Sequence, residues 1–426
     1  MVAVMLAATA RAQQPSALDE ARQAMEGKQY AQAEAIYRKA LAQSPASPEL
    51  LTDLGLSVQM QGRSAEAMHE FSLALRQKYI PETYALLAEE RCRMGDLDDL
   101  RPMLARIFRE ELHNQRIIAA VAPCYLDVDE PVESAVIYRS LHDSGDYPAD
   151  LSLIQLAKSY IRSGQFFAAK LSKAPGGEPF MAALRQAPTQ GSAGARSEFA
   201  RAAAVSPYFK PDLDWNSALN LWEQHPEDTA LLYLLSVLSA EEGMRQVQLC
   251  EARYPDSPYL AQFYADALAD QGRADQAIAQ YEQLIQQHPD LTDLYYSLGL
   301  LREKREEWPQ AAEAFRQQLT QQPGDERATA HLSRCMLQLE QYAEVRDLLA
   351  LRMKLAHPPQ WASLNYSEAE QKLGNPGEAI RVLVEAEKEP DADKLVHYRL
   401  MHLYTVSGRA ADAQREFALF QTASKK

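Results

Sequence analysis

Cysteine is scarce in this sequence, with four residues at positions 92, 124, 250 and 335 among 426. No two of them form a CxxC pair, and their spacing matches no zinc-binding pattern, so a cysteine-based metal site is excluded. Buried free thiols inside helices are the simpler interpretation. A disulfide between Cys92 and Cys124 is the alternative if the protein is exported.

Basic residues are outnumbered, and long apolar runs are missing. The formal net charge is −15 and the sequence pI is near 5.2, with no stripe of Lys and Arg that would offset the average. Such a surface repels a phosphate backbone, so we expect no nucleic-acid partner. No stretch approaches the ~18 consecutive apolar residues of a membrane-spanning helix, so we expect no transmembrane span.

The N-terminus begins with a short apolar run. Val2 to Ala10 is followed by Arg11 and Ala12, which puts small residues at the two positions that a signal peptidase reads. The sequence therefore predicts a signal peptide over residues 1–12, a mature chain that starts at Gln13, and a periplasmic or secreted protein. No Lys or Arg precedes the run, so a cytoplasmic protein is the alternative.

Sequence signatures of catalysis are also missing. There is no HExxH, no GxSxG, no phosphate-binding loop of the Walker type and no dinucleotide fingerprint. His397 and His402 are five residues apart, which puts them on different faces of a helix and argues against a metal pair. We therefore expect no enzyme, no metal and no cofactor.

What the sequence does contain is a repeat of 34 residues. Alanine, leucine, glutamate, glutamine and arginine dominate the composition, which favours helices throughout. A small residue recurs at this period and is followed four residues later by a large apolar one. The small residues are Ala277, Ala311, Val345, Ala379 and Ala413, with earlier copies at Ala33 and Ala67, and the large ones are Tyr281, Phe315, Leu349, Leu383 and Phe417. Five residues before each small residue of the second half lies the expected turn between two helices, at Gly272, Glu306, Glu340, Gly374 and Gly408.

This pattern resembles the tetratricopeptide repeat (TPR), in particular that of exported bacterial TPR proteins. The resemblance implies an all-α fold, an α-solenoid in which antiparallel helix pairs stack into a right-handed superhelix. Each pair has an apolar stripe too broad to bury alone, so neighbouring pairs must stack, and only small side chains fit where the helices cross.

The repeat register predicts two arrays. We expect an N-terminal array over 14–171 and a C-terminal array over 212–424. Between them, 172–211 is rich in Pro, Gly and Ser and is interpreted as a linker with short helices at 179–186 and 195–204. Pro226 and Pro255 are only 29 residues apart, which predicts one unit with a shortened second helix.

The resemblance also implies a binding surface. In this family the first helix of each unit lines a concave groove that holds a peptide or protein partner, which predicts a non-catalytic adaptor of the bacterial cell envelope. In this sequence, the residues that the resemblance places in the groove are Tyr259, Asp266, Asp293, Tyr296, Arg327, Arg334, Trp361, Tyr398 and His402. The alternative is a purely structural role, in which Tyr259, Trp361 and Tyr398 pack against neighbouring helices. The other functional alternatives are a cytoplasmic adaptor and an accessory subunit of a glycosyltransferase or another envelope enzyme.

Overall fold

The computed structural model describes residues 17–44, 47–94, 97–145, 147–186, 199–354, 358–388 and 394–423. The predicted signal peptide, 1–12, lies outside these residues. Over the described ranges the chain forms helices and no strand, which confirms the all-α solenoid.

The first half of the chain runs from α1 to α10. Its helices are α1 (Ala17–Glu26), α2 (Tyr30–Gln43), α3 (Pro48–Gln59), α4 (Ser64–Gln77), α5 (Pro81–Met94), α6 (Leu97–Glu111), α7 (Gln115–Val121), α8 (Cys124–Asp127), α9 (Pro131–Ser144) and α10 (Ala149–Lys173).

The second half begins after a helix over 178–186. Its helices are α12 (Phe199–Val205), α13 (Trp215–Gln224), α14 (Thr229–Arg253), α15 (Pro258–Asp270), α16 (Ala274–Gln287), α17 (Leu294–Lys304), α18 (Trp308–Gln321), α19 (Glu326–Gln338), α20 (Tyr342–Leu349), the 3-10 turn η1 (Arg352–Lys354), α21 (Gln360–Lys372), α22 (Pro376–Ala386), α23 (Lys394–Val406) and α24 (Ala410–Ala423).

The small repeat residues sit where helices cross. Ala33, Ala67, Ala277, Ala311 and Ala379 are fully buried, and Ala413 is nearly so. A larger side chain at these places would have to push two helices apart. One turn later, Phe315 fills the space between the paired helices α17 and α18, where a Cβ added to Gly299 would be 2.6 Å from its ring. The residue at the same position in the last unit, Phe417, is instead 48% exposed.

The turns between paired helices share one backbone conformation. All five positions predicted from the repeat have a positive φ, including the non-glycine residues Glu306 (59°) and Glu340 (57°). Glycine adopts this left-handed region without strain, whereas a residue with a Cβ does so at a cost of about 1–2 kcal/mol. The packing of the flanking helices therefore imposes the turn even where the sequence offers no glycine.

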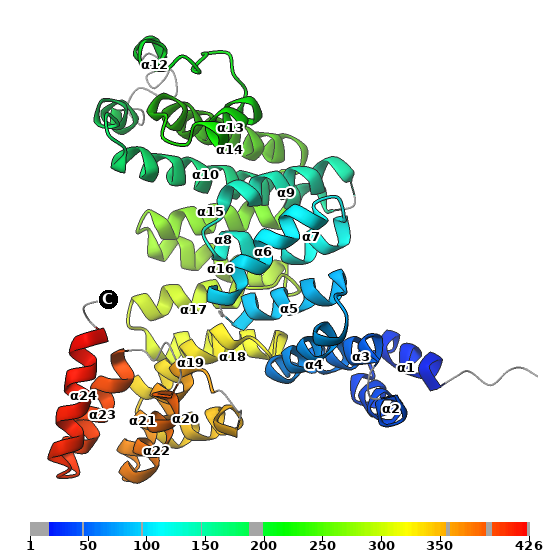
Figure 1. Ribbon diagram of the computed structural model, residues 1–426, viewed down its shortest axis with the longest axis vertical. Coiled ribbons are helices and arrows are strands. Elements are labelled where there is room, and N and C mark those ends of the chain that lie inside the picture. The colour runs from blue at the N-terminus through cyan, green and yellow to red at the C-terminus, as the bar shows by residue number, and fades with distance from the viewer. Residues whose placement is uncertain are drawn as a thin grey trace, which may run out of the picture.

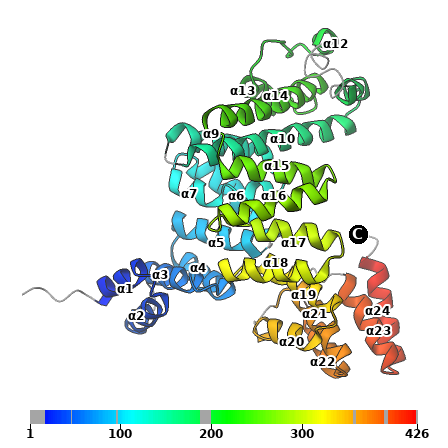
Figure 2. The same ribbon diagram turned by 180° about the vertical axis from the view of Figure 1, so that it is seen from behind.

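The chain folds back on itself at its far end. Figures 1 and 2 show the first half rising along one side of the molecule and the second half descending beside it, with α12 at the end where the direction reverses. Helices α10 and α14 run along each other there, and Gly243 of α14 allows the close approach, because a Cβ would lie 2.8 Å from Ile161 Cγ1.

This pairing corrects one expectation. The stretch between Pro226 and Pro255 is not a shortened helix pair, because α14 runs without a break through 25 residues. Gly243, which could have marked a turn, instead lies inside the helix and serves its packing against α10.

The segment 172–211 begins at the end of α10. A helix over 178–186 and α12 fall at the two places where short helices are expected, while 187–198 lies outside the described residues. Phe180 from this segment is buried and stacks on Tyr233 of α14, with ring centroids 5.1 Å apart. Among the described helices, none is long and apolar enough to cross a membrane.

Candidate partner-binding surface

The predicted groove of the second half faces the first half of the same chain. Helices α15, α17 and α19 are the first helices of their units, the ones expected to line the concave side. Helix α10 contacts α15 and α5 contacts α19. At Gly62 and Gly324, turns from the two halves meet so closely that a Cβ on Gly62 would lie 3.1 Å from the Gly324 nitrogen. The concave side is therefore partly covered by the chain itself.

Asp266 joins the two halves. Its carboxylate accepts a hydrogen bond from Lys158 Nζ of α10 at 2.8 Å and another from the Tyr281 hydroxyl at 2.6 Å. Burial and the adjacent Asp266 raise the pKa of Tyr281 well above its usual value, so the hydroxyl stays protonated and continues to donate. The predicted groove position Asp266 is thus engaged within the molecule.

Next to this contact the two halves leave an inner cleft of about 650 Å³. Its lining residues come from α8, α10 and α15 and the turn after α15. They are Leu126, Lys158, Ile161, Arg162, Gln165, Phe263, Asp266, Ala267, Asp270 and Gln271. One wall is basic, through Lys158 and Arg162, and the other is acidic, through Asp266 and Asp270.

A second hollow of about 290 Å³ continues from the inner cleft. It shares Asp266 and Asp270 with the cleft and extends past Leu300 and Leu301 to Lys304 on α17. The two together combine apolar side chains with several charged and amide groups, a mixture that a peptide segment with both kinds of side chain can contact.

Arg327 and Asp293 belong to an internal ion network. Arg327 Nη2 lies 3.1 Å from Asp293 Oδ1 and 3.4 Å from Asp325 Oδ2, and its guanidinium lies 4.7 Å from the centre of the Tyr296 ring. Asp325 is buried and also caps α19 by accepting from the Ala328 amide. Three of the predicted groove residues, Asp293, Tyr296 and Arg327, are therefore brought together and largely satisfied by one another.

Arg334 is half exposed but paired. It donates to Glu303 Oε1 at 2.5 Å, and His331 Nδ1 lies 2.6 Å from Glu303 Oε2. Burial alone would raise the pKa of Glu303, but the hydrogen bonds from His331 and Arg334 outweigh it and hold the pKa below its usual value.

The remaining predicted positions divide between packing and exposure. Tyr259 packs against the cluster formed by α10, α14 and α15, and Trp361 packs against the core around α19 and α21. Tyr398 is 42% exposed, and His402 is exposed with its ring 5.5 Å from that of Tyr398. Tyr398 and His402 thus form an accessible pair at the C-terminal end.

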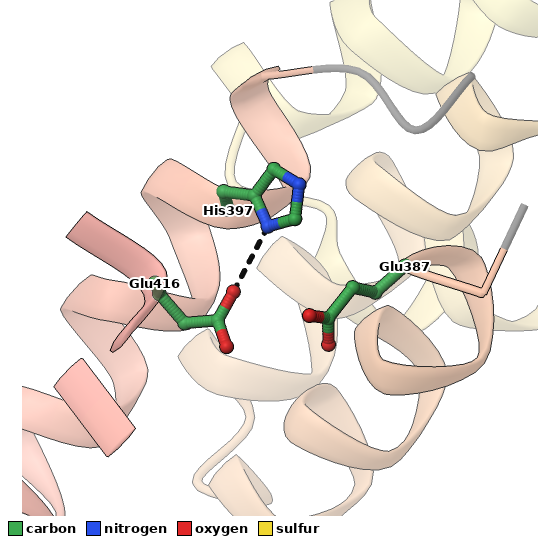
Figure 3. Close-up of side chains that lie close together, drawn as sticks. All are labelled: Glu387, His397 and Glu416. Carbon is green, nitrogen blue, oxygen red and sulfur yellow. Dashed lines mark hydrogen bonds and ion pairs between the residues drawn. The ribbon is translucent and has the colours of Figure 1, made fainter. Parts of the chain in front are cut away.

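His397, on the same helix as His402, points elsewhere. Figure 3 shows its ring directed at Glu416 of α24, with Glu387 at the end of α22 close by. The Nδ1–Oε2 distance between His397 and Glu416 is 2.9 Å. Burial and the negative charge of Glu416 raise the pKa of Glu387.

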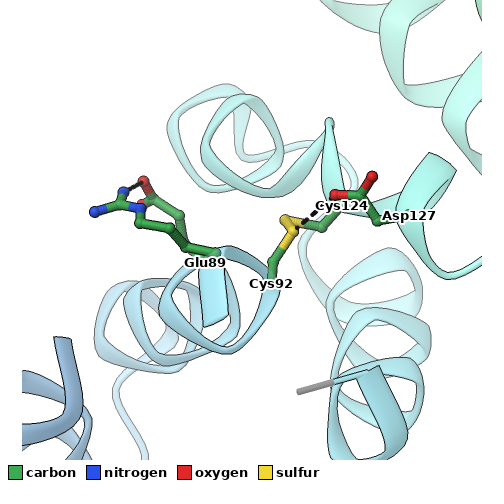
Figure 4. Close-up of a disulfide and its surroundings, with 5 residues drawn as sticks. Glu89, Cys92, Cys124 and Asp127 are labelled. Atoms are coloured by element: carbon green, nitrogen blue, oxygen red, sulfur yellow. Dashed lines mark hydrogen bonds and ion pairs between the residues drawn. A yellow bond between two sulfur atoms is a disulfide. The ribbon is translucent and has the colours of Figure 1, made fainter. Parts of the chain in front are cut away.

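A disulfide joins α5 to α8 in the first half of the chain. Cys92 of α5 and Cys124 of α8 are bonded, with their Cα atoms 5.7 Å apart (Figure 4). Asp127, on the same short helix as Cys124, lies with one carboxylate oxygen 3.3 Å from Cys92 Sγ. Burial raises the pKa of Asp127, and the positive charges of Arg327 and Arg162 partly oppose that rise. The disulfide therefore holds α8, and with it Leu126 of the inner cleft, against α5.

Sequence reasoning missed the basic wall of the inner cleft. Lys158 and Arg162 lie in α10, about a hundred residues before their counterparts in α15, and no local pattern links the two segments. Their i,i+4 spacing on one helix face was the only available indication.

Comparison with known families agrees with the repeat pattern. Three models match the chain: "Tetratricopeptide repeat" over 18–79, "TPR repeat" over 265–305 and "Tetratricopeptide repeat" over 304–365. The chain therefore contains tetratricopeptide repeats in both halves, and these matches indicate no catalytic family. A search of curated proteins gives no match.

The solved structures that match this chain share little sequence with it. One is Cut9 in the APC/C hetero-tetramer Cut9–Hcn1, at 15% identity over 97% of this chain and 94% of that one, with a TM-score of 0.33. Another is a monomeric mutant of IFIT1 with Gppp-AAAA, at 13% identity over 88% of this chain and 90% of that one, with a TM-score of 0.31. At these values we draw nothing from them about this chain's partners.

Proposed function

We propose that this chain is a non-catalytic adaptor that holds a segment of a partner protein in the inner cleft. Tetratricopeptide repeats generally mediate protein–protein interaction, and the repeats here support that class of function. The observation that supports this location is the cleft itself, whose lining combines the apolar Leu126, Ile161 and Phe263 with basic side chains from α10 and acidic ones from α15. Such a site favours a segment with an apolar side chain flanked by charges of both signs, because opposed walls fix its direction.

Reversing the charge of Asp270 tests this location. Asp270 is exposed at the end of α15, so Asp270→Lys should leave the fold intact while it removes one charged edge of the cleft. We expect capture of the partner to weaken by about 1–3 kcal/mol, roughly 5- to 150-fold. Proteins captured from the native cell extract are quantified by mass spectrometry and then titrated as purified partners.

The matched control is Asp256→Lys. Asp256 is also exposed and lies in the turn before α15, away from the residues that line the cleft, so the change of charge is the same. Capture that is equal for the parent and both variants would show that binding lies elsewhere. The exposed residues Arg334, Tyr398 and His402 would then be the next to replace.

We further propose that the protein is exported to the cell envelope or secreted. The small residues Ala10 and Ala12 support cleavage after residue 12, and the Cys92–Cys124 disulfide suits an oxidising compartment. N-terminal sequencing of the protein isolated from its own cells is expected to begin at Gln13. A chain that begins at Met1, with both cysteines open to alkylation, would instead indicate the cytoplasmic adaptor.

A further inference from the structure

Three side chains that can bind a metal converge at the last helix pair. Glu387 follows the last residue of α22, His397 lies in the first turn of α23, and Glu416 lies in the middle of α24. Figure 3 shows the two carboxylates and the imidazole directed toward one another. One ligand atom from each residue lies within 4.8 Å of the others.

The charges of this group are not balanced while His397 is neutral. Glu416 is fully buried, and Arg415 binds its second oxygen, Oε1, with Nη2 at 2.6 Å. Arg415 compensates one of the two carboxylates, and the imidazole of His397 is uncharged in its basic form. One negative charge therefore remains beside a buried site, which is unfavourable unless a cation or a proton joins it.

The geometry is close to that of a bound cation. Zinc–ligand bonds of about 2.0–2.2 Å in a tetrahedral site place the ligand atoms roughly 3.4 Å apart. His397 Nδ1 and Glu416 Oε2 are already 2.9 Å apart, so they need to separate only slightly. Glu387, at a helix end and only partly buried, can move the remaining distance by rotation of its side chain.

We propose that Glu387, His397 and Glu416 bind one divalent transition-metal cation of the Zn²⁺ type. One imidazole nitrogen and two carboxylate oxygens suit such a cation, whereas Ca²⁺ and Mg²⁺ prefer all-oxygen sites. Arg415 is the positioning residue, because its contact with Oε1 fixes the Glu416 carboxylate and leaves Oε2 for the metal.

The cation would tie the last helix pair to the unit before it. Glu387 belongs to the preceding unit, whereas His397 and Glu416 belong to the last one, so a bound ion bridges the two. The inference is independent of the proposed binding function, since none of these residues lines the inner cleft.

The test uses the full-length protein, without an affinity tag and stripped of metal with a chelator. Zn²⁺ is titrated against it in competition with a chromophoric chelator, and the melting temperature is followed in parallel. We expect one equivalent of Zn²⁺ to bind and to raise the melting temperature, and Ca²⁺ and Mg²⁺ to do neither. His397→Gln and Glu387→Gln should each weaken Zn²⁺ binding at least ~10-fold, an effect of the size seen when metal sites lose a supporting group.

Controls separate this site from adventitious binding. His402→Gln removes an exposed histidine from the same helix and should leave the affinity for Zn²⁺ unchanged. Glu387→Gln changes a partly exposed side chain, so it keeps the test valid if His397→Gln does not fold. Failure of the parent to bind Zn²⁺, or an equal loss in His402→Gln, would overturn the proposal, as would unchanged binding in Glu387→Gln.

Discussion

Replacing Phe315 by alanine is expected to lower the free energy of unfolding by about 3–5 kcal/mol. The ring is 0% exposed, stacks on His331 with centroids 5.3 Å apart, and fills the hollow above Gly299. Its removal leaves a cavity among α17, α18 and α19 that the glycine cannot fill. Urea denaturation followed by circular dichroism measures the loss.

Phe417 is the matched control for this substitution. It occupies the same repeat position three units later, but its side chain is 48% exposed. Phe417→Ala should therefore cost only about 1 kcal/mol, because nearly half of its surface already faces water. Equal losses from the two variants would contradict the difference in burial on which this prediction rests.

Removal of the Cys92–Cys124 disulfide should lower stability by about 3–4 kcal/mol. The two cysteines are 32 residues apart, and the bond restricts the unfolded chain by closing a loop of this length. The double substitution Cys92→Ala/Cys124→Ala is compared with the parent by urea denaturation under non-reducing conditions.

A reductant supplies the control for the disulfide. It should destabilise the parent to the level of the double variant and leave the double variant unaffected, because Cys250 and Cys335 are free thiols. A parent that is equally stable with and without reductant would show that the bond contributes nothing to the folded protein.

The repeat units were predictable because their determinants are local. The spacing from Ala311 to Phe315, and the turn position at Glu306, recur at a fixed period, and each acts on helices adjacent in sequence. The structure gives Glu306 the same left-handed backbone as the glycines at equivalent positions. A short-range pattern of this kind reports on stacking between neighbours, which is most of what holds a solenoid together.

The packing of the second half of the chain against the first was not predictable from the repeat pattern. Lys158 meets Asp266 across 108 residues, and no local pattern shows that Gly243 packs against α10. The family resemblance therefore predicts a concave groove lined by the first helices, whereas part of this surface lies between the two halves. His397 was likewise compared with His402, its neighbour in sequence, whereas its partner Glu416 lies 19 residues away on another helix.

The fold-back at α10 and α14 changes how the molecule would respond to tension. In an open solenoid each unit touches only its neighbours, so force applied at the two ends extends the whole array like a spring. Here α1 and α24 both lie toward the same end of the long axis, and the halves are joined side by side (Figure 1). Tension would first load the contact at Gly62 and Gly324 and then the Lys158–Asp266 pair, so the molecule would open as a zipper toward α12 before any repeat unit lengthened.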